Sequence, residues 1–204
     1  VGLWQGRFKG EFNVYSKTTN NLLSNMDMPH SMGFSSYVDN VGEVKNRGWE
    51  ASTTIYLLRD AHRDINWIVS GQLTYNKNFI SKLSAAVKEQ NEAYLQEDVD
   101  VSNLFYEGLP QNGIYVVRSL GIDPSTGQEI YLDKDGNRTD TWKASDKVFA
   151  GQSDPRYRGI GSTMFMWKGL TFNLSFGFHW GGKVYNQTIV ERVEVGRTTL
   201  MGQN

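Results

Sequence analysis

Apolar and polar side chains alternate along several stretches of the chain, most strictly over residues 49–58. One side of this stretch carries Trp49, Ala51, Thr53, Ile55 and Leu57, and the other carries Glu50, Ser52, Thr54 and Tyr56. A period of two residues is typical of a β-strand with two unlike faces. The same alternation predicts strands over residues 3–17, 65–77, 158–167 and 171–180.

Two of these stretches differ in how clearly they separate their faces. In residues 171–180 the separation is clear: Phe172, Leu174, Phe176, Phe178 and Trp180 alternate with Thr171, Asn173, Ser175, Gly177 and His179. In residues 158–167, Ile160, Ser162, Met164 and Met166 lie opposite Gly159, Gly161, Thr163, Phe165 and Trp167. This weaker pattern leaves open which side continues the apolar face.

The connections between the expected strands fall into two classes. Residues 59–64 and 168–169 are short turns, whereas residues 18–45 and 79–157 are expected to be long loops. The second loop is predicted to carry a short helix around residues 85–89, short strands at 115–118 and 129–132, and turns at 123–127 and 135–136. If the strands run up and down, all short turns lie at one end, an arrangement typical of outer-membrane barrels.

Composition narrows the possible classes of protein. The 204 residues contain 21 basic and 22 acidic side chains, so a net charge of -1 offers no basic field for nucleic acid. Cysteine is absent, which excludes disulfides and thiolate metal sites. A transmembrane helix needs about 18 apolar residues in a row, which the chain lacks, whereas a barrel strand needs only about 9–11 alternating residues. We expect an all-β fold of antiparallel up-and-down strands whose apolar face meets either lipid or a soluble core.

Five short motifs follow one another along the chain. They are N-x-G-x-x-x-N-x-G-x-E at residues 40–50, N-x-N-x-I at 76–80, G-x-P at 108–110 followed by G-x-D-P-x-T-G at 121–127, and the segments 151–155 and 181–186. In these motifs the chain resembles, over roughly residues 7–188, the SusC/RagA-type TonB-dependent outer-membrane transporters of Bacteroidetes.

The resemblance implies a 22-stranded barrel around a plug in the outer membrane of a Gram-negative bacterium. It also implies import of oligosaccharides or other large nutrients such as peptides, with a SusD-type lipoprotein as lid. Energy would arrive from TonB through parts of the protein outside this chain. Residues 1–204 would then be a late, partial barrel segment bordered by membrane lipid, and residues 79–157 a long external loop region within it.

Two sets of residues are candidates for function. Strand parity predicts that the barrel lumen is lined by Arg7, Lys9, Glu11, Glu50, Asn66, Gln72, Asn173 and Ser175. In the long loop, rings that could stack on a ligand or anchor a partner are Tyr94, Phe105, Tyr106, Tyr115 and Trp142. The alternative is that these rings pack the core of the loop itself.

No arrangement of residues indicates catalysis or a cofactor. The three histidines, His30, His62 and His179, lack metal-ligand spacing, and residues 133–137 lack the distal Glu of a calcium loop. Nothing in the sequence holds two carboxylates in the geometry that glycoside hydrolysis requires. We therefore expect a protein that is not an enzyme, with no cofactor. A soluble β-sandwich or barrel that binds glycans is the alternative, and a secreted glycosidase has little support.

Overall fold

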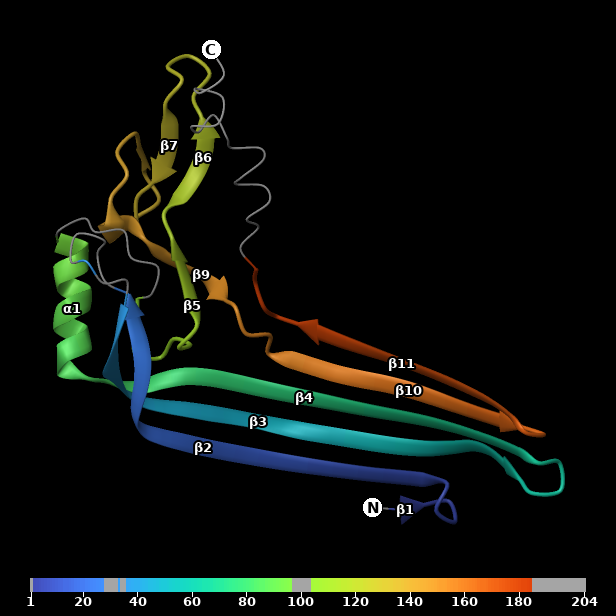
Figure 1. The fold of residues 1–204 in the computed structure, drawn as a ribbon. Helices are drawn as coiled ribbons and strands as arrows, with labels where there is room; N and C mark the ends of the chain where they lie inside the picture. Colours follow the sequence, from blue (N-terminus) through green and yellow to red (C-terminus); the bar gives the residue numbers. More distant parts are fainter. Residues whose placement is uncertain (1, 28–32, 34–35, 97–103, 185–204) are drawn as a thin grey trace.

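The structure, a computed structural model, describes residues 2–27, 33, 36–96 and 104–184. Its main feature is one antiparallel sheet in the strand order β1-β2-β3-β4-β10-β11 (Figure 1). The strands are β1 (Gly2–Leu3), β2 (Phe8–Asp27), β3 (Ser36–Asp60), β4 (Ile65–Leu83), β10 (Tyr157–Trp167) and β11 (Leu170–Trp180). Every neighbouring pair is antiparallel, so the predicted up-and-down all-β fold is confirmed.

The first strand begins later than alternation predicts. Trp4 and Gln5 have positive φ angles of 53° and 56°, and residues 4–7 form a turn between β1 and β2. The prediction of a continuous strand over residues 3–17 was therefore wrong. Residues 4–7 lie outside the alternation of β2, because a left-handed backbone reverses the chain there.

The prediction of a long loop over residues 18–45 was also wrong. β2 continues to Asp27 and β3 already begins at Ser36, so most of this stretch is paired strand. Two register shifts, between Thr19 and Leu22 and between Leu22 and Leu23, break the period of two. Because each β-bulge adds an unpaired residue, it hides the alternation that marks a strand.

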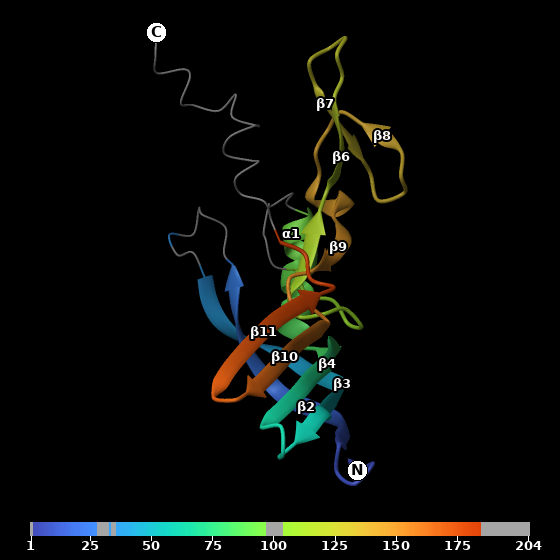
Figure 2. The same ribbon diagram turned by 90° about the vertical axis from the view of Figure 1, so that its right-hand side faces the viewer.

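The two short turns lie at the opposite end of the sheet from the connection between β4 and β10, as predicted. Residues 61–64 and 168–169 form the two tight turns, and the amide of Lys168 donates to the carbonyl of Asp64 at 3.1 Å. The connection between β4 and β10 rises from the other end (Figures 1 and 2). The elements of this connection therefore lie at one end of the sheet, which we call the loop end; the opposite end is the turn end.

The long connection has its own secondary structure. It contains α1 (Ala85–Gln96), β5 (Gly113–Val116), β6 (Arg118–Ile122), β7 (Glu129–Leu132), β8 (Arg138–Thr139), η2 (Ala144–Asp146) and β9 (Val148–Gln152). The helix is longer than expected, the strand expected at 115–118 is divided between β5 and β6, and the strand expected at 129–132 is present as β7. In the described part of the chain, no helix has the length and apolar character needed to cross a membrane.

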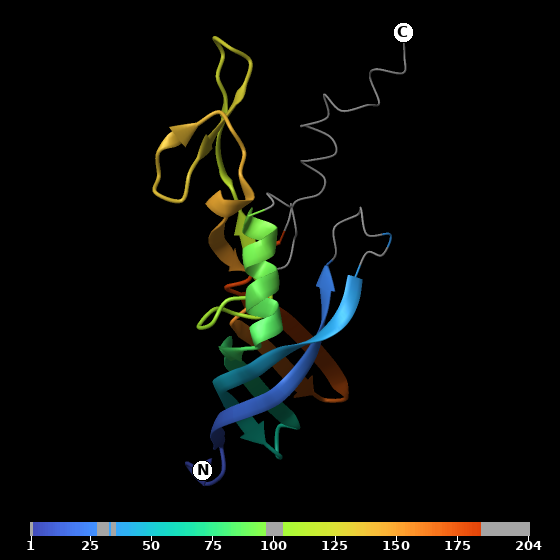
Figure 3. The same cartoon turned by 90° about the vertical axis from the view of Figure 1, so that its left-hand side faces the viewer.

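The buried core lies where this connection meets the sheet. Val41, Val44 and Ile80 of the sheet pack with Val87 of α1 and Phe105 of the following segment. Figure 3 shows α1 standing at the loop end of the strands, while β6, β7 and β8 project away from it. Among the described residues, no second layer covers most of the six-stranded sheet, and no further strand pairs with its edge strands β1 and β11.

Candidate functional site: the two faces of the sheet

A row of five aromatic rings crosses the sheet near its loop end. Phe12, Trp49, Tyr75, Tyr157 and Trp180 come from five adjacent strands, and neighbouring ring centroids lie 6.0, 6.1, 4.9 and 5.9 Å apart. Each such pair is worth about 0.5–1.5 kcal/mol beyond the area that it buries. We call these five rings the aromatic row and the side of the sheet that carries them the aromatic face.

A second group of rings marks the turn end of the same face. Trp67 and Phe165 meet edge to face with centroids 6.3 Å apart. Eight residues separate Trp67 from Tyr75 along β4, and the same number separates Phe165 from Tyr157 along β10. At about 3.3 Å per residue and a strand tilt near 40°, the two groups are about 20 Å apart, close to the apolar band of about 25 Å in membrane barrels.

The register also settles which side of β10 is apolar. Gly159 lies opposite Phe178 and Gly161 opposite Phe176, so the glycine side of β10 belongs to the aromatic face. A Cβ at Gly159 would come within 2.3 Å of the Phe178 ring, and one at Gly161 within 2.4 Å of the Phe176 ring. A side chain at either position would displace the β11 ring that now covers it.

The described part of the chain leaves the β11 side chains of the aromatic face uncovered. On β11, Phe176 is 61% and Trp180 74% exposed, and Phe172, Leu174 and Phe178 are exposed as well. Fully burying one such side chain is worth about 1.5–3 kcal/mol, and these are about half exposed, so β11 in water forgoes roughly 5 kcal/mol. That loss is comparable with the whole stability of a small domain, so contact with an apolar partner on this face would stabilise the protein.

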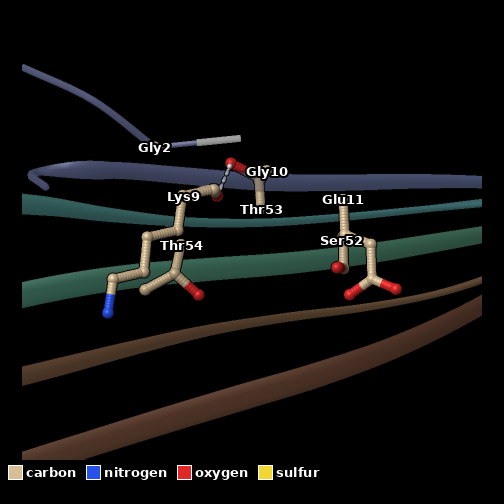
Figure 4. A pocket seen from close by; sticks show the side chains of 7 residues that line it. All are labelled: Gly2, Lys9, Gly10, Glu11, Ser52, Thr53 and Thr54. Atoms are coloured by element: carbon tan, nitrogen blue, oxygen red, sulfur yellow. Dashed lines mark hydrogen bonds between the residues drawn. The ribbon is translucent and has the colours of Figure 1, made fainter.

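The opposite side, the polar face, carries most of the residues expected in the lumen. The register places Lys9, Glu11, Glu50, Asn66, Gln72, Asn173 and Ser175 on this one side. Figure 4 shows Lys9, Glu11, Ser52 and Thr54 pointing to it together, beside a depression of about 420 Å³. Arg7 differs, because it lies in the turn before β2, where its carbonyl accepts from the amide of Tyr56.

A network of amide side chains lies on the polar face at the level of the loops. Asn46 Oδ1 accepts from Asn76 Nδ2 at 3.2 Å and from Asn78 Nδ2 at 3.0 Å. Tyr15 donates to Asn76 Oδ1 at 3.2 Å, and Asn78 Oδ1 accepts from the backbone amide of Gln111 at 3.0 Å. The network thereby ties three strands of the sheet to the long connection.

A polar cavity of about 210 Å³ adjoins this network. It is lined by Tyr15, Thr74, Asn76, Asn78, Gln152, Asp154, Pro155, Arg156 and Arg158. Arg156 Nε donates to Gln152 Oε1 at 3.2 Å, and Arg158 lies 4.0 Å from Asp154 Oδ1. Three amides, two hydroxyls, a carboxylate and two guanidinium groups make this cavity suited to a strongly hydrogen-bonding ligand.

Sequence reasoning did not single out the residues of this cavity. The motif N-x-N-x-I contained a usable signal, because Asn76 and Asn78 are two residues apart and so share a face with Ile80. Tyr15 likewise continues the polar parity of Lys9 and Glu11. The contribution of β9 and β10 depends on a long-range return of the chain that no local pattern reveals.

The loop aromatics lie mainly in the core of the loop. Phe105 is 3%, Tyr115 8% and Tyr94 9% exposed, each within a cluster of apolar side chains. Burial raises the pKa of the Tyr115 hydroxyl well above its usual value. Tyr106, whose ring centroid lies 5.2 Å from that of Tyr115, and Trp142 are only half-buried, so these two are the rings of the set that a ligand or partner could reach.

Glu107 fixes the loop to the end of β4. Its Oε1 accepts from the amide of Leu83 at 2.9 Å and lies 2.8 Å from Lys88 Nζ on α1. The hydrogen bond with Lys88, followed by that from the Leu83 amide, lowers the pKa of this carboxyl. The amide of Ile80 also donates to the carbonyl of Leu109 at 2.9 Å, so the loop runs alongside the strand.

The described residues contain no cluster of three or more His, Cys, Asp or Glu side chains placed to hold a metal ion. Asp133 binds within its own turn, where Oδ1 accepts from the amide of Asn137 at 2.8 Å. His30 lies outside the described residues. The polar face therefore offers hydrogen-bonding and charged side chains along its surface.

Comparison with known proteins gives relatives of one kind. The chain is 26% identical over 207 residues to TonB-dependent receptor P3 of Formosa agariphila, covering 94% of this chain and 20% of the relative. It is 38% identical over 161 residues to TonB-dependent receptor P26 of the same organism, covering 78% and 14%. It is 23% identical over 213 residues to TonB-dependent receptor SusC of Bacteroides thetaiotaomicron, covering 100% and 20%. No protein-family model matches the chain.

Solved structures agree with these relatives. The fold matches the structure of the RagAB peptide transporter with a TM-score of 0.70 and 25% identity, covering 89% of this chain and 20% of the other. The open-open state of the RagAB peptide importer matches with a TM-score of 0.68 and 26% identity, covering 89% and 19%.

The chain spans only a fifth or less of the length of these relatives. All of them are receptors or importers, and none is an enzyme, as expected from the absence of a catalytic arrangement. Their names match the family whose motifs occur along this sequence. The similarities in sequence and in structure together identify the chain as a segment of a SusC/RagA-type TonB-dependent transporter.

Proposed function

We propose that residues 1–204 form part of the wall of an outer-membrane importer in a Gram-negative bacterium. The aromatic face meets lipid, the polar face lines the lumen, and residues 79–157 include the external loop region. The observation that carries the proposal is the sorting of side chains between the two faces, with the aromatic row crossing five adjacent strands near their loop end. Rings at that level are typical of the membrane interface.

The transported ligand is an oligosaccharide or a peptide, captured at the loop end. The polar cavity beside Tyr15 and Asn76 supports this, because its amides and guanidinium groups suit sugar hydroxyls and peptide groups alike. Asn66, Gln72, Asn173 and Ser175 continue the polar face toward the turn end. The RagAB importer to which the fold is similar carries peptides, which supports the peptide as one of the two classes.

A SusD-type surface lipoprotein closes the loop end, and TonB acts through parts of the protein outside this chain. The strands β6, β7 and β8 support a partner at this position, since they form an arm that projects beyond the sheet (Figure 2). Leu120 and Ile122 of this arm are exposed apolar side chains. Half-buried Tyr106 and Trp142 lie in the same connection and are candidates for contact with ligand or lid.

Spin labels on neighbouring positions of β11 test the orientation of the sheet. In the full-length transporter reconstituted in lipid, labels at Phe172 and Phe176 should respond to membrane-soluble oxygen. Labels at Asn173 and Ser175, the matched controls on the same strand, should respond to a water-soluble nickel chelate. The opposite pattern would end the proposal, and a soluble glycan-binding module predicts that the labels at Phe172 and Phe176 reach neither reagent.

A further inference from the structure

Cationic side chains lie on the aromatic face just beyond the aromatic row. Arg47 and Lys77 are direct partners in the register of β3 and β4, two residues beyond Trp49 and Tyr75. Two residues correspond to about 7 Å along a strand, or about 5 Å along the membrane normal at a tilt near 40°. Both side chains are exposed. They therefore lie just beyond the aromatic row, on its loop side.

Phe79 holds the two cations side by side. The Arg47 guanidinium carbon and the Lys77 Nζ each lie 5.7 Å from the centroid of this ring. A cation–π contact orients a charged group without neutralising it. The ring thus contacts both cations of this cross-strand pair on the aromatic face.

The carboxylate nearest along this side of β3 already has a partner. Glu43 Oε1 lies 3.0 Å from Lys45 Nζ and also accepts from the Ser81 hydroxyl at 2.5 Å. Within the described residues, Arg47 and Lys77 form no ion pair. The charge of this site is therefore open to an anion from outside the chain.

We propose that Arg47 and Lys77 bind the phosphate groups of anionic lipids in the leaflet on the loop side. The inference rests on the proposed orientation of the aromatic face toward lipid. Aromatic rings mark the headgroup level of a bilayer, and basic side chains beside that level attract anionic headgroups. Guanidinium and ammonium groups on one site provide the paired donors that a phosphate accepts.

Binding of phosphorylated lipid to the full-length transporter tests this site. The purified protein in neutral detergent would be titrated with bis-phosphorylated lipid A and with dephosphorylated lipid A, and bound lipid counted by native mass spectrometry. The Arg47→Gln/Lys77→Gln variant should bind the phosphorylated lipid about 30-fold more weakly, at roughly fivefold per cation removed. Lys17→Gln is the matched control, since Lys17 is equally exposed and lies opposite Asn46 on the polar face.

Several results would overturn the inference. The first two are binding of phosphorylated lipid by the double variant as strong as by the wild type, and binding of dephosphorylated lipid as strong as that of phosphorylated lipid. The third is displacement of the lipid by inorganic phosphate at the same concentration. The fourth is an acidic protein that the wild type captures and the double variant does not. Quenching of Trp49 by brominated lipid, measured on wild type and variant, shows whether a negative result concerns the phosphate site alone or also the proposed lipid-facing orientation. If Trp49 is quenched but the phosphate preference is absent, the lipid-facing orientation stands and the phosphate site does not.

Discussion

Gly48 shows how one residue of a family motif shapes the polar face. A Cβ at this position would lie 2.1 Å from the carbonyl oxygen of Tyr75 and 2.6 Å from the Tyr15 hydroxyl. Tyr15 is its direct partner across the strands and donates to Asn76. The absence of a side chain at Gly48 therefore allows the tyrosine to cross the sheet and join the amide network.

Replacing Gly48 with alanine should destabilise the full-length protein by about 1–3 kcal/mol, because the methyl group would overpack this site. Gly71→Ala is the matched control, since a Cβ there would meet only the Thr53 methyl at 3.8 Å. Urea unfolding in detergent, followed by tryptophan fluorescence, measures both. Equal midpoints for the two variants would show that Tyr15 does not depend on Gly48.

Other motif residues are likewise structural. Asn40 Oδ1 accepts from the amide of Gly42 at 2.9 Å, and Gly42 has a φ of 125° beside the carbonyl of Lys82. Asp123 closes the turn between β6 and β7, where its Oδ1 accepts from the amide of Ser125 at 2.8 Å. The motifs that identify the family thus report bulges, turns and loop attachment, and they do not name the ligand.

At the scale of the element, alternation predicted strands well where the two faces meet different surroundings. Residues 49–58, 65–77 and 171–180 lie within the span between the two groups of rings, or next to it, and their faces differ sharply. Beyond the aromatic row, β2 and β3 carry polar residues such as Asn20, Ser24 and Asp39 among the apolar ones. With bulges added, residues 18–45 look like a loop in the sequence although they are mostly strand.

The candidate site could be predicted only in part, for a similar reason. Parity within a strand assigned Lys9, Glu50, Gln72 and their neighbours to one side, because the period of a strand is local. The cavity needs β9 and β10 to return beside β4 across a long connection. The burial of Tyr94 and Tyr115 within the loop, and of Phe105 where the loop meets the sheet, depends on tertiary packing, which a single ring in a sequence does not reveal.

The attachment of the long connection to β4 should depend on pH through Glu107. Its folded pKa is lowered, so its contribution is complete above the ordinary carboxyl value of 4.5 and is lost as the pH falls through the folded pKa. We expect the Leu83 amide to exchange faster with deuterium below pH 4.5, after correction for intrinsic exchange.

Glu107→Gln should give fast exchange at the Leu83 amide already at pH 7. After correction for intrinsic exchange, the rate in this variant should change little between pH 7 and pH 4. Glu89→Gln, an exposed position on α1, serves as the control and should behave like the wild type. Protection that is the same in Glu107→Gln and wild type at pH 7 would show that other contacts hold the loop.

For the whole molecule, the arm of β6, β7 and β8 gives the partner proposal a direct test. The double change Leu120→Glu/Ile122→Glu should lower co-purification of the SusD-type lipoprotein with the full-length transporter at least tenfold, because charge replaces apolar contact. Lys134→Glu, in the turn that follows β7 on the same arm, is the control. Undiminished capture by the double variant would place the partner contact elsewhere on the loop end.

The way the long connection joins the sheet also affects how such proteins can diversify. β10 pairs with β4 from Tyr157 opposite Tyr75 to Trp167 opposite Ile65, as though the two strands were joined by a simple hairpin. The residues between them leave and return at the same end of the wall. An insertion attached in this way can lengthen, shorten or be exchanged by recombination without altering the register below it. One sheet scaffold can therefore carry many different loop surfaces during evolution.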